Sequence, residues 1–457
     1  MIKYIFITLL FPVTCFAQVT LPAIFGDGMV LQQKTHAPIW GKDKPGVTIM
    51  VTTSWNKSSS TIADEKGYWK LKIPTPTAGG PYSLMIEGSD NIKLTNVYIG
   101  EVWICSGQSN MDRSLLGRRN EPVEDSAEMI ASSKNDRLRF FTVKKNASKY
   151  LANDVRGNWI SAQPANAGEF SAVAYSFAKK IQQKLNVPVG MVVSAWGGSS
   201  IEAWMDSISI IQQKDIVVSD STKDNRKPGY LYNGMIAPLI GMSVKGIIWY
   251  QGEANVPNAD TYERKFSNLI QSWRTNWKIG PLPFYFVQIA PYNFKDYESG
   301  KLRDAQMRVV KTVANTGMAV TLDIGSCKTL HPPKKREVGE RLAYWALGKT
   351  YKVRSDTISG PILKSILKKS NGAIEISFDF AQKGLRISDN KNSGFELAGS
   401  DGIYYPADIV VGSNSITVKS SLVNNPVNVR YGYANCTDAN LFNSAGLPAG
   451  SFISDLL

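Results

Sequence analysis

Hydrophobic and polar residues alternate along the two outer parts of the chain, as they do in half-buried β-strands. The alternation is clear from Thr48 to Thr52 and from Tyr68 to Ile73, and glycine-bearing turns separate such runs. Residues 18–97 are therefore predicted to form a β-sandwich-like domain. The same pattern returns from Ile374 to Phe380, and residues 352–457 are predicted to be a β-rich region.

Between these parts, strands alternate with helices. Apolar residues recur at helical spacing from Phe170 to Leu185, and a buried strand follows at Val189 to Val193. Similar pairs continue through Trp345. Residues 98–351 are thus predicted to form an α/β domain with a parallel sheet and helices on both faces. Ligands of such domains bind outside the carboxyl ends of the strands.

Small, polar or titratable residues follow four of the predicted strands. Ser109 comes after a strand-like run that ends at Ile104, and a glycine-bearing loop spans 194–200. The other two segments that follow predicted strands are Gln251-Gly252-Glu253 and the stretch from Asp323 to His331. A serine on such a turn is where a nucleophile is placed, although most turn serines only cap a helix. The chain contains no G-x-S-x-G sequence, which excludes the usual α/β-hydrolase signature.

The chain has only two histidines, and His36 lies in the predicted N-terminal β domain. If an imidazole deprotonates a serine in this protein, His331 is the only plausible base. Neither an HExxH sequence nor a Cys/His ligand cluster is present, so we expect no metal and no cofactor.

A formal net charge of +14 makes the 457-residue chain clearly basic. The basic residues occur in pairs and one triplet, without a long run that would follow a nucleic-acid backbone, so no nucleic acid is expected as a partner. A positive field favours acidic ligands, including acidic sugars. The oligomeric state is left open.

The first 17 residues have the pattern of a secretory signal peptide, with one lysine, an apolar run and a small residue at Ala17. The run is too short to span a bilayer permanently, and lipid attachment at Cys15 is disfavoured by the residues before it. We therefore expect a secreted or periplasmic protein without stable membrane insertion. The remaining cysteines Cys105, Cys327 and Cys436 allow one disulfide and leave one thiol.

Several motifs, taken in order, resemble the sialate O-acetylesterase family of SGNH-type hydrolases. They are Gly100 to Met111, Trp196-Gly197-Gly198 to Trp204, Trp249 to Glu253, and His331-Pro332. Segments at 25–32 and 440–449 also resemble the opening and closing segments of that family. The resemblance therefore covers nearly the whole mature chain.

The resemblance implies an ester hydrolase with a flavodoxin-like, three-layer SGNH catalytic domain between flanking β regions. Ser109 matches the nucleophile of the family and His331 its general base. The implied oxyanion donors are the backbone N–H of Ser109, the N–H of Gly198, with Gly197 as the alternative, and the side-chain amide of Gln251.

Glu253 and Trp204 are further candidates for binding the substrate. For Trp204 the alternative is ordinary core packing of an aromatic ring. Many SGNH enzymes place an aspartate three residues before the histidine, but this chain has Lys328 there. Either a Ser–His dyad operates, with a backbone carbonyl orienting the ring, or a carboxylate comes from elsewhere, with Asp323 and Glu253 as candidates.

The leading hypothesis is a secreted carbohydrate O-acetylesterase that acts on O-acetylated sialic acids. Acetylated plant polysaccharide, xylan or pectin, is the alternative substrate, because the motifs report the acyl chemistry better than the sugar. A non-catalytic glycan-binding protein on a hydrolase scaffold is the alternative from another class. Lys328 is its only support.

Overall fold

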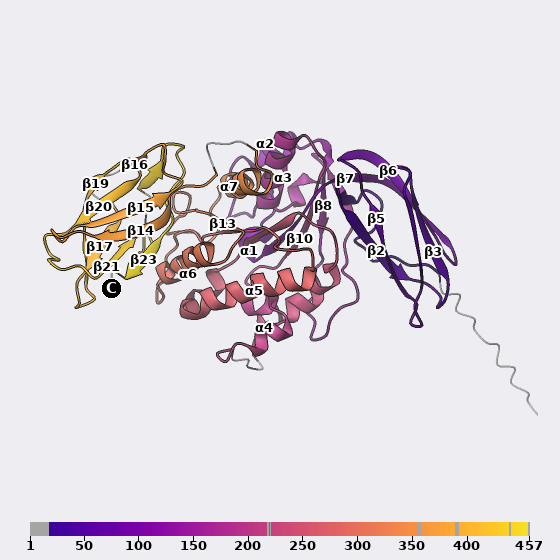
Figure 1. The fold of residues 1–457 in the computed structure, drawn as a ribbon, viewed down its shortest axis with the longest axis horizontal. Coiled ribbons are helices and arrows are strands. Elements are labelled where there is room, and N and C mark those ends of the chain that lie inside the picture. Colours follow the sequence, from indigo (N-terminus) through magenta and orange to yellow (C-terminus); the bar gives the residue numbers. More distant parts are fainter. Residues whose placement is uncertain are drawn as a thin grey trace, which may run out of the picture.

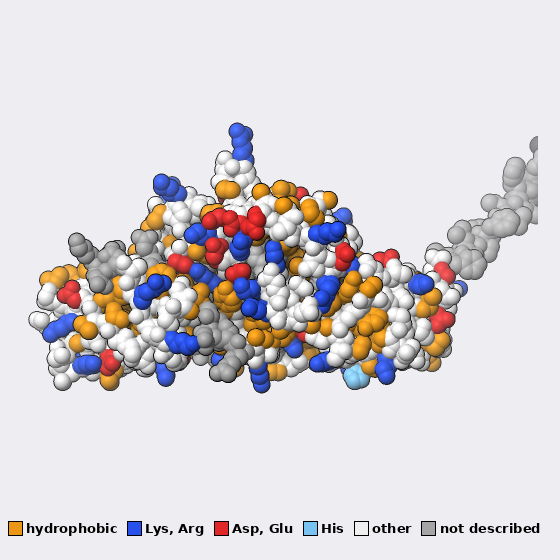
Figure 2. Space-filling view, turned by 90° about the horizontal axis from the view of Figure 1, so that it is seen from above, with side chains coloured by type: hydrophobic (Ala, Val, Ile, Leu, Met, Phe, Trp, Pro, Cys, Tyr) orange, Lys and Arg blue, Asp and Glu red, His pale blue; other side chains and the backbone are white. Residues whose placement is uncertain are grey.

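The computed structural model describes residues 18–455, apart from 217–218, 220, 354–357, 389–392 and 438–439. The predicted signal peptide lies outside the described residues. Figure 1 shows three parts in a row, with a β region at each end and a central part that carries the helices. None of the described helices is long and apolar enough to cross a membrane. In Figure 2, Lys and Arg side chains are spread over the visible face and do not form one continuous stripe.

The N-terminal β region shows the alternation predicted from the sequence. In β5, Trp69, Leu71 and Ile73 are buried while the residues between them are exposed. The strand β3 pairs with β4 and β6, and β2 pairs with β5. The strands are β1 (Val30–Gln32), β2 (His36–Lys42), β3 (Thr48–Thr53), β4 (Ser58–Ile62), β5 (Tyr68–Pro74) and β6 (Gly79–Glu87).

A single strand, β7 (Asn91–Gly107), belongs to both the N-terminal region and the central sheet. Its first half pairs with β6, and its second half pairs with β10 and β11. The predicted boundary between residues 97 and 98 falls inside this strand, where its residues change from alternately exposed to continuously buried. The end of β7 is consequently fixed by two sheets.

The central part is a mixed α/β structure built on a large sheet in the order β13-β12-β11-β7-β10-β8-β9. Adjacent strands are parallel, except that the edge strand β9 is antiparallel to β8. These strands are β8 (Asn135–Thr142), β9 (Trp159–Ala162), β10 (Val189–Ala195), β11 (Gly246–Tyr250), β12 (Phe284–Val287) and β13 (Thr316–Ala319). The predicted alternation of strands and helices is therefore confirmed.

Helices lie on both sides of this sheet, with α2, α3 and α7 on one side and α4, α5 and α6 on the other (Figure 1). The helices are α1 (Ser109–Asp112), α2 (Ser126–Ala131), α3 (Ala172–Leu185), α4 (Ser207–Ile211), α5 (Tyr262–Trp277), α6 (Ser299–Thr312) and α7 (Lys335–Trp345). Short 3-10 and π turns lie at Ala167–Glu169, Ile201–Trp204, Asp224–Arg226, Tyr232–Ile236, Ala237–Leu239, Glu253–Thr261 and Ala346–Thr350.

The strand order brings three loops to one point. Because β10 and β11 flank β7, Ala195 and Tyr250 both pair with Gly107 at the carboxyl ends of their strands. Gly107 has a φ of 136°, and a Cβ there would lie 2.1 Å from the Tyr250 carbonyl oxygen. Only glycine fits this close approach, which turns the chain from the strand into α1.

The C-terminal region contains two four-stranded antiparallel sheets, β14-β15-β20-β19 and β18-β17-β21-β23, together with the pair β16-β22. Its strands are β14 (Ile362–Lys368), β15 (Ile374–Asp379), β16 (Leu385–Ile387), β17 (Phe395–Ala398), β18 (Tyr404–Pro406), β19 (Asp408–Val411), β20 (Ser415–Lys419), β21 (Asn428–Tyr431), β22 (Leu441–Asn443) and β23 (Phe452–Asp455).

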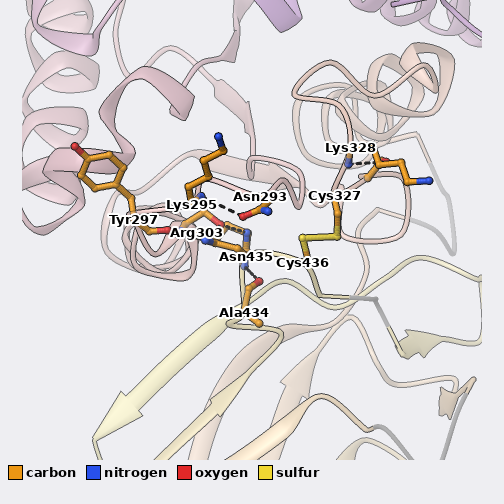
Figure 3. Close-up of a disulfide and its surroundings, with 11 residues drawn as sticks. Asn293, Lys295, Tyr297, Arg303, Cys327, Lys328, Ala434, Asn435 and Cys436 are labelled. Atoms are coloured by element: carbon orange, nitrogen blue, oxygen red, sulfur yellow. Dashed lines mark hydrogen bonds between the residues drawn. A yellow bond between two sulfur atoms is a disulfide. The ribbon is translucent and has the colours of Figure 1, made fainter.

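Several contacts fasten this region to the central part, among them the hydrogen bonds of Arg303 and a disulfide. The buried guanidinium of Arg303 on α6 donates to the Tyr433 carbonyl at 3.0 Å and to Ser451 Oγ at 2.9 Å. A disulfide joins Cys327 to Cys436, as Figure 3 shows, and Cys105 is a buried free thiol. The sequence did not decide which two cysteines pair. The disulfide between Cys327 and Cys436 anchors the loop that leads to His331.

Candidate active site

Ser109 and His331 share a hydrogen bond although 222 positions separate them in the sequence. Ser109 is the first residue of α1, directly after β7, and His331 lies in the loop after β13. The distance from Ser109 Oγ to His331 Nε2 is 2.8 Å. The structure therefore brings together the two residues that the sequence singled out for proton transfer.

A carboxylate completes the arrangement, and it is one that sequence reasoning missed. Glu121 Oε1 lies 2.5 Å from His331 Nδ1, and Arg113 donates to the other oxygen of the same carboxylate. Neither carboxylate named as a candidate takes this position. Asp323 is held through both oxygens by Arg341, and Glu253 accepts a bond from Asn110. Of the two arrangements considered from the sequence, the structure has the one in which a carboxylate from another part of the chain orients His331.

Glu121 lies in the irregular segment between α1 and α2, and this explains why no pattern revealed it. The segment has neither strand nor helix periodicity, and it is paired only by isolated bridges, one between Ser114 and Ser171 and one between Arg118 and Glu121. Lys328, which replaces the aspartate expected before the histidine, is exposed. It plays no part in orienting the imidazole.

The electrostatics of the three side chains suit a general base. Burial lowers the pKa of the His331 imidazole below its usual value, and the hydrogen bond and charge of Glu121 oppose this shift without cancelling it. Burial also acts on Glu121, but its bonds to His331 and Arg113 outweigh burial and lower its pKa. Near neutral pH, an ionised Glu121 therefore faces a neutral imidazole that can accept a proton from Ser109.

Two backbone N–H groups stand free beside Ser109. Neither Gly197 N nor Gly198 N donates to another described residue, while the carbonyls of both glycines are bound by Asn225 and Arg226. A Cβ on Gly197 would lie 3.4 Å from Ser109 Cβ, and Gly198 has a φ of 73°. This loop presents donors to the serine, and both predicted alternatives have the required free N–H.

The side-chain amide of Gln251 does not face the same space. It is fully buried, and its Nε2 donates to Ser199 O at 3.2 Å and to Asn255 Oδ1 at 2.7 Å. Its Oε1 accepts from the Tyr262 hydroxyl at 2.9 Å. Both of its hydrogens are in use, so the oxyanion role predicted for Gln251 has no free donor in this structure.

A different amide, that of Gln108, does line the pocket. Its Oε1 accepts from the backbone N–H of Gly252 at 3.4 Å and of Ala254 at 3.2 Å. Because both partners are donors, the atom they contact is the oxygen, and the NH₂ group is the other end. That NH₂ group has no partner among the described residues, and Gln108 is next to Ser109 in the pocket wall.

Glu253 also lines the pocket, at the end of a buried polar chain. Its Oε1 accepts from Asn110 Nδ2 at 2.5 Å, and Asn110 Oδ1 accepts from Lys335 Nζ at 2.5 Å. Burial raises the pKa of Glu253 and lowers that of Lys335 to about 7. Glu253 Oε2 is itself buried and has no partner among the described residues, so this oxygen does not face the open part of the pocket.

Trp204 is a core residue and not a wall of the pocket. Its ring is fully buried against Trp249, and its Nε1 donates to Ser199 Oγ at 2.8 Å. The core-packing alternative therefore describes Trp204, because the 3-10 turn that carries it packs against Trp249 of β11. The half-buried Trp196, directly after β10, is the tryptophan that lines the pocket.

The pocket in front of Ser109 has a volume of about 550 Å³. Its charged side chains include Arg113, Arg118, Lys145 and Arg226 on one hand and Asp112 and Glu253 on the other. Within the described ranges, no three His, Cys, Asp or Glu side chains are grouped so that they could hold a metal ion.

A serine, an imidazole and a carboxylate bonded in this order, beside free backbone donors, form the constellation of acyl-transferring serine hydrolases. Residues 99–347 match the family described as carbohydrate esterase, sialic acid-specific acetylesterase. The chain belongs to this family and is a carboxylic ester hydrolase, a carbohydrate acetylesterase.

Known relatives match this chain over most of its length. A sialate O-acetylesterase from Mus musculus is 28% identical over 440 residues, covering 81% of this chain and 80% of the relative. That from Homo sapiens is 29% identical over 413 residues, covering 80% and 77%. The crystal structure of a carbohydrate acetylesterase from Xanthomonas citri superimposes with a TM-score of 0.88 at 35% identity, covering 96% of this chain and all of that one.

Proposed function

We propose that the protein is a secreted O-acetylesterase that removes acetyl groups from O-acetylated sialic acids through a Ser109–His331–Glu121 triad. The observation that carries this proposal is the unbroken series of hydrogen bonds from Ser109 Oγ through His331 to Glu121. It supports catalysis over simple glycan binding, because an imidazole held between a hydroxyl and a carboxylate can take and return a proton.

In the first half of the reaction, Ser109 Oγ attacks the acetyl carbonyl carbon while its proton passes to His331 Nε2. The imidazolium that forms is stabilised by Glu121, which is itself held by Arg113. The tetrahedral intermediate then expels the sugar oxygen, which takes the proton from His331. The products of this half are the deacetylated sugar hydroxyl and an acetyl ester on Ser109.

In the second half, water takes the place of the sugar. His331 accepts a proton from the water while the water oxygen attacks the acetyl-enzyme. The second tetrahedral intermediate then releases acetic acid, which ionises to acetate in solution. His331 returns the proton to Ser109 Oγ, which restores the starting state. No group other than these side chains and water is required for the proton balance.

The oxyanion of both intermediates is assigned to the backbone N–H of Ser109 and that of Gly198 or Gly197. For the third donor we favour the amide of Gln108 over that of Gln251, since only the former has an NH₂ group free in the pocket. Each such donor contributes about 100- to 1,000-fold to turnover in enzymes of this kind.

The charges of the pocket favour an acidic sugar. Arg113 is neutralised by Glu121, and Lys145 by Asp112 at 2.8 Å. Arg118 and Arg226 have no carboxylate partner within the described part of the chain, so they remain to attract an anion. Sialic acids carry a carboxylate and xylan backbones do not, which is why we prefer sialic acids over acetylated xylan. Pectin is acidic as well, and we prefer sialic acids over pectin because relatives named sialate O-acetylesterase match this chain.

The strand order and the helices on both sides of the sheet support a flavodoxin-like, three-layer SGNH catalytic domain. Export with cleavage after Ala17 is part of the proposal. Amino-terminal sequencing of the exported protein should then begin at Gln18.

The test is acetate release from O-acetylated sialic acid, acetylated xylan and p-nitrophenyl acetate. We expect Ser109→Ala to abolish all three activities. Arg118→Gln should raise KM for the acidic sugar and leave that for the aryl ester unchanged. Full activity of Ser109→Ala would exclude the triad, and a preference for acetylated xylan would exclude the sialic acid proposal.

A further inference from the structure

A second cavity of about 440 Å³ adjoins the active-site pocket. The two cavities share two wall residues, Arg226 and Ala254, so they are neighbours along one surface. Arg226 is fixed between them, since its Nε donates to Gly198 O at 2.9 Å. The volume of the second cavity lies within the range of about 300–1,000 Å³ that is usual for small-ligand sites.

A buried ion network makes the floor of this cavity rigid. Lys265 Nζ lies 2.9 Å from Glu202 Oε1 and 2.7 Å from Asp215 Oδ2, and only 4% of the lysine side chain is exposed. Glu202 also accepts from Asn255 Nδ2 through both of its oxygens. Arg264 completes the neutralisation of Asp215 at 2.6 Å. These charges are matched within the floor, so they attract no net charge from a ligand.

The rim of the cavity, in contrast, offers unused polar groups. The side chains of Asn258 and Asp260 are exposed and line the cavity, and neither has a partner among the described residues. Pro228 and Pro257 add apolar ring surface beside them. Carboxylates and amides that accept and donate hydrogen bonds, next to small apolar surfaces, suit a sugar with several hydroxyl groups.

The two cavities therefore differ in the ligand that they fit. The unneutralised Arg118 lines only the pocket at Ser109, and Arg226 lies at the boundary of both cavities. The second cavity alone has the free carboxylate of Asp260 at its rim, above a floor whose charges are matched. That carboxylate repels a second acidic sugar and binds neutral hydroxyl groups.

We propose that the second cavity is a subsite for the neutral sugar to which the acetylated acidic sugar is glycosidically linked. The inference rests on the proposed function of the neighbouring pocket and extends it, since it assigns the preferred substrate to the class of acidic sugars at the end of a glycan. A substrate of this class places its ester at Ser109 and its neutral unit across Arg226, against Asn258 and Asp260.

The test compares one O-acetylated sialic acid free in solution with the same acid linked to lactose. Wild type should hydrolyse the linked form with a kcat/KM about 10-fold higher or more, which corresponds to about 1.4 kcal/mol of added transition-state binding. Asn258→Ala and Asp260→Ala should each lower kcat/KM for the linked form about 5- to 10-fold and leave that for the free acid unchanged. Glu263→Gln is the matched control, because this carboxylate is near in sequence but lines neither cavity.

Equal kcat/KM values of wild type for the two forms would overturn the subsite. So would variants that lower both forms by the same factor, since that pattern indicates a general loss of structure. If wild type cleaves p-nitrophenyl acetate but neither form of the acidic sugar, the proposed function itself fails, and the subsite fails with it.

Discussion

Replacing Glu121 by glutamine removes one charge from the catalytic arrangement, together with the oxygen that accepts from Arg113. The amide that replaces the carboxylate would keep an oxygen that can accept from His331 Nδ1, so the imidazole should stay in place. What is lost is the negative charge that stabilises the imidazolium formed when Ser109 gives up its proton. The expected result is a lower kcat together with a lower pKa of His331.

The magnitude follows from the distance and the exposure of the pair. Two unit charges about 4 Å apart interact by about 1 kcal/mol in water and about 4 kcal/mol at an effective dielectric constant of about 20. The Glu121 side chain is 29% exposed and is partly neutralised by Arg113, which places the interaction well below the upper end of that range. We therefore expect a loss of about 1.4–2.7 kcal/mol, or about 10- to 100-fold in kcat.

The assay is the pH dependence of kcat/KM with p-nitrophenyl acetate. His331 must be neutral to act as a base, and its pKa is lowered by burial, so the acid limb of wild type should lie below pH 6.5. Loss of the Glu121 charge removes an influence that raises this pKa. The acid limb of the Glu121→Gln variant should therefore move to still lower pH while its plateau falls.

The control is Asp323→Asn, which removes a carboxylate that is closer to His331 in the sequence but is bound by Arg341. We expect its kcat to stay within about twofold of wild type and its acid limb to stay in place. An unchanged kcat in Glu121→Gln, or an acid limb that moves to higher pH, would refute the reasoning.

Three further outcomes are expected. Gln108→Glu keeps the oxygen that Gly252 and Ala254 bind but removes the amide donor, so kcat should fall about 100- to 1,000-fold. In Gln251→Glu, kcat should fall far less. A larger loss of kcat in Gln251→Glu than in Gln108→Glu would assign the oxyanion to Gln251. Cys436→Ser opens a bridge between residues 109 positions apart, so Tm should fall, and a reductant should lower the Tm of wild type but not of the variant. Lys335 loses its proton above about pH 7 in the folded protein but keeps it to about pH 10.5 in the unfolded chain. The stability of wild type should therefore rise between these two pH values, because the unfolded state binds more protons. Measurements of Tm against pH should show a smaller rise for Lys335→Met.

Patterns that depend on neighbouring residues were readable from the sequence. The alternation in β5 and the apolar run of β10 each reflect which face of an element is buried, and both elements form as predicted. The placing of Ser109 and His331 was also accessible, because each follows a strand, and the carboxyl ends of parallel strands lie at one edge of a sheet. The scarcity of histidine then left a single base to consider.

Other features depended on contacts between segments far apart in the chain. The sequence predicted Gln251 and Trp204 as site residues, but the polar group of each is bonded to a buried partner. The glutamine with a free amide is Gln108, and the tryptophan that lines the pocket is Trp196. Hydrogen bonds with other loops decide the direction of a side chain at the end of a strand. This direction cannot be predicted from the spacing of residues along that one strand.

Local patterns were enough to establish that a serine and a histidine stand at the ends of strands in an α/β domain between two β regions, because burial periodicity and turn residues are properties of short segments. Long-range packing alone selected the carboxylate that orients His331 and the cysteine that anchors its loop. Glu121 and Cys436 lie in or beside irregular segments, 210 and 109 positions from their partners. Their roles arise from the packing of the whole chain, which has no counterpart in the pattern of any single segment.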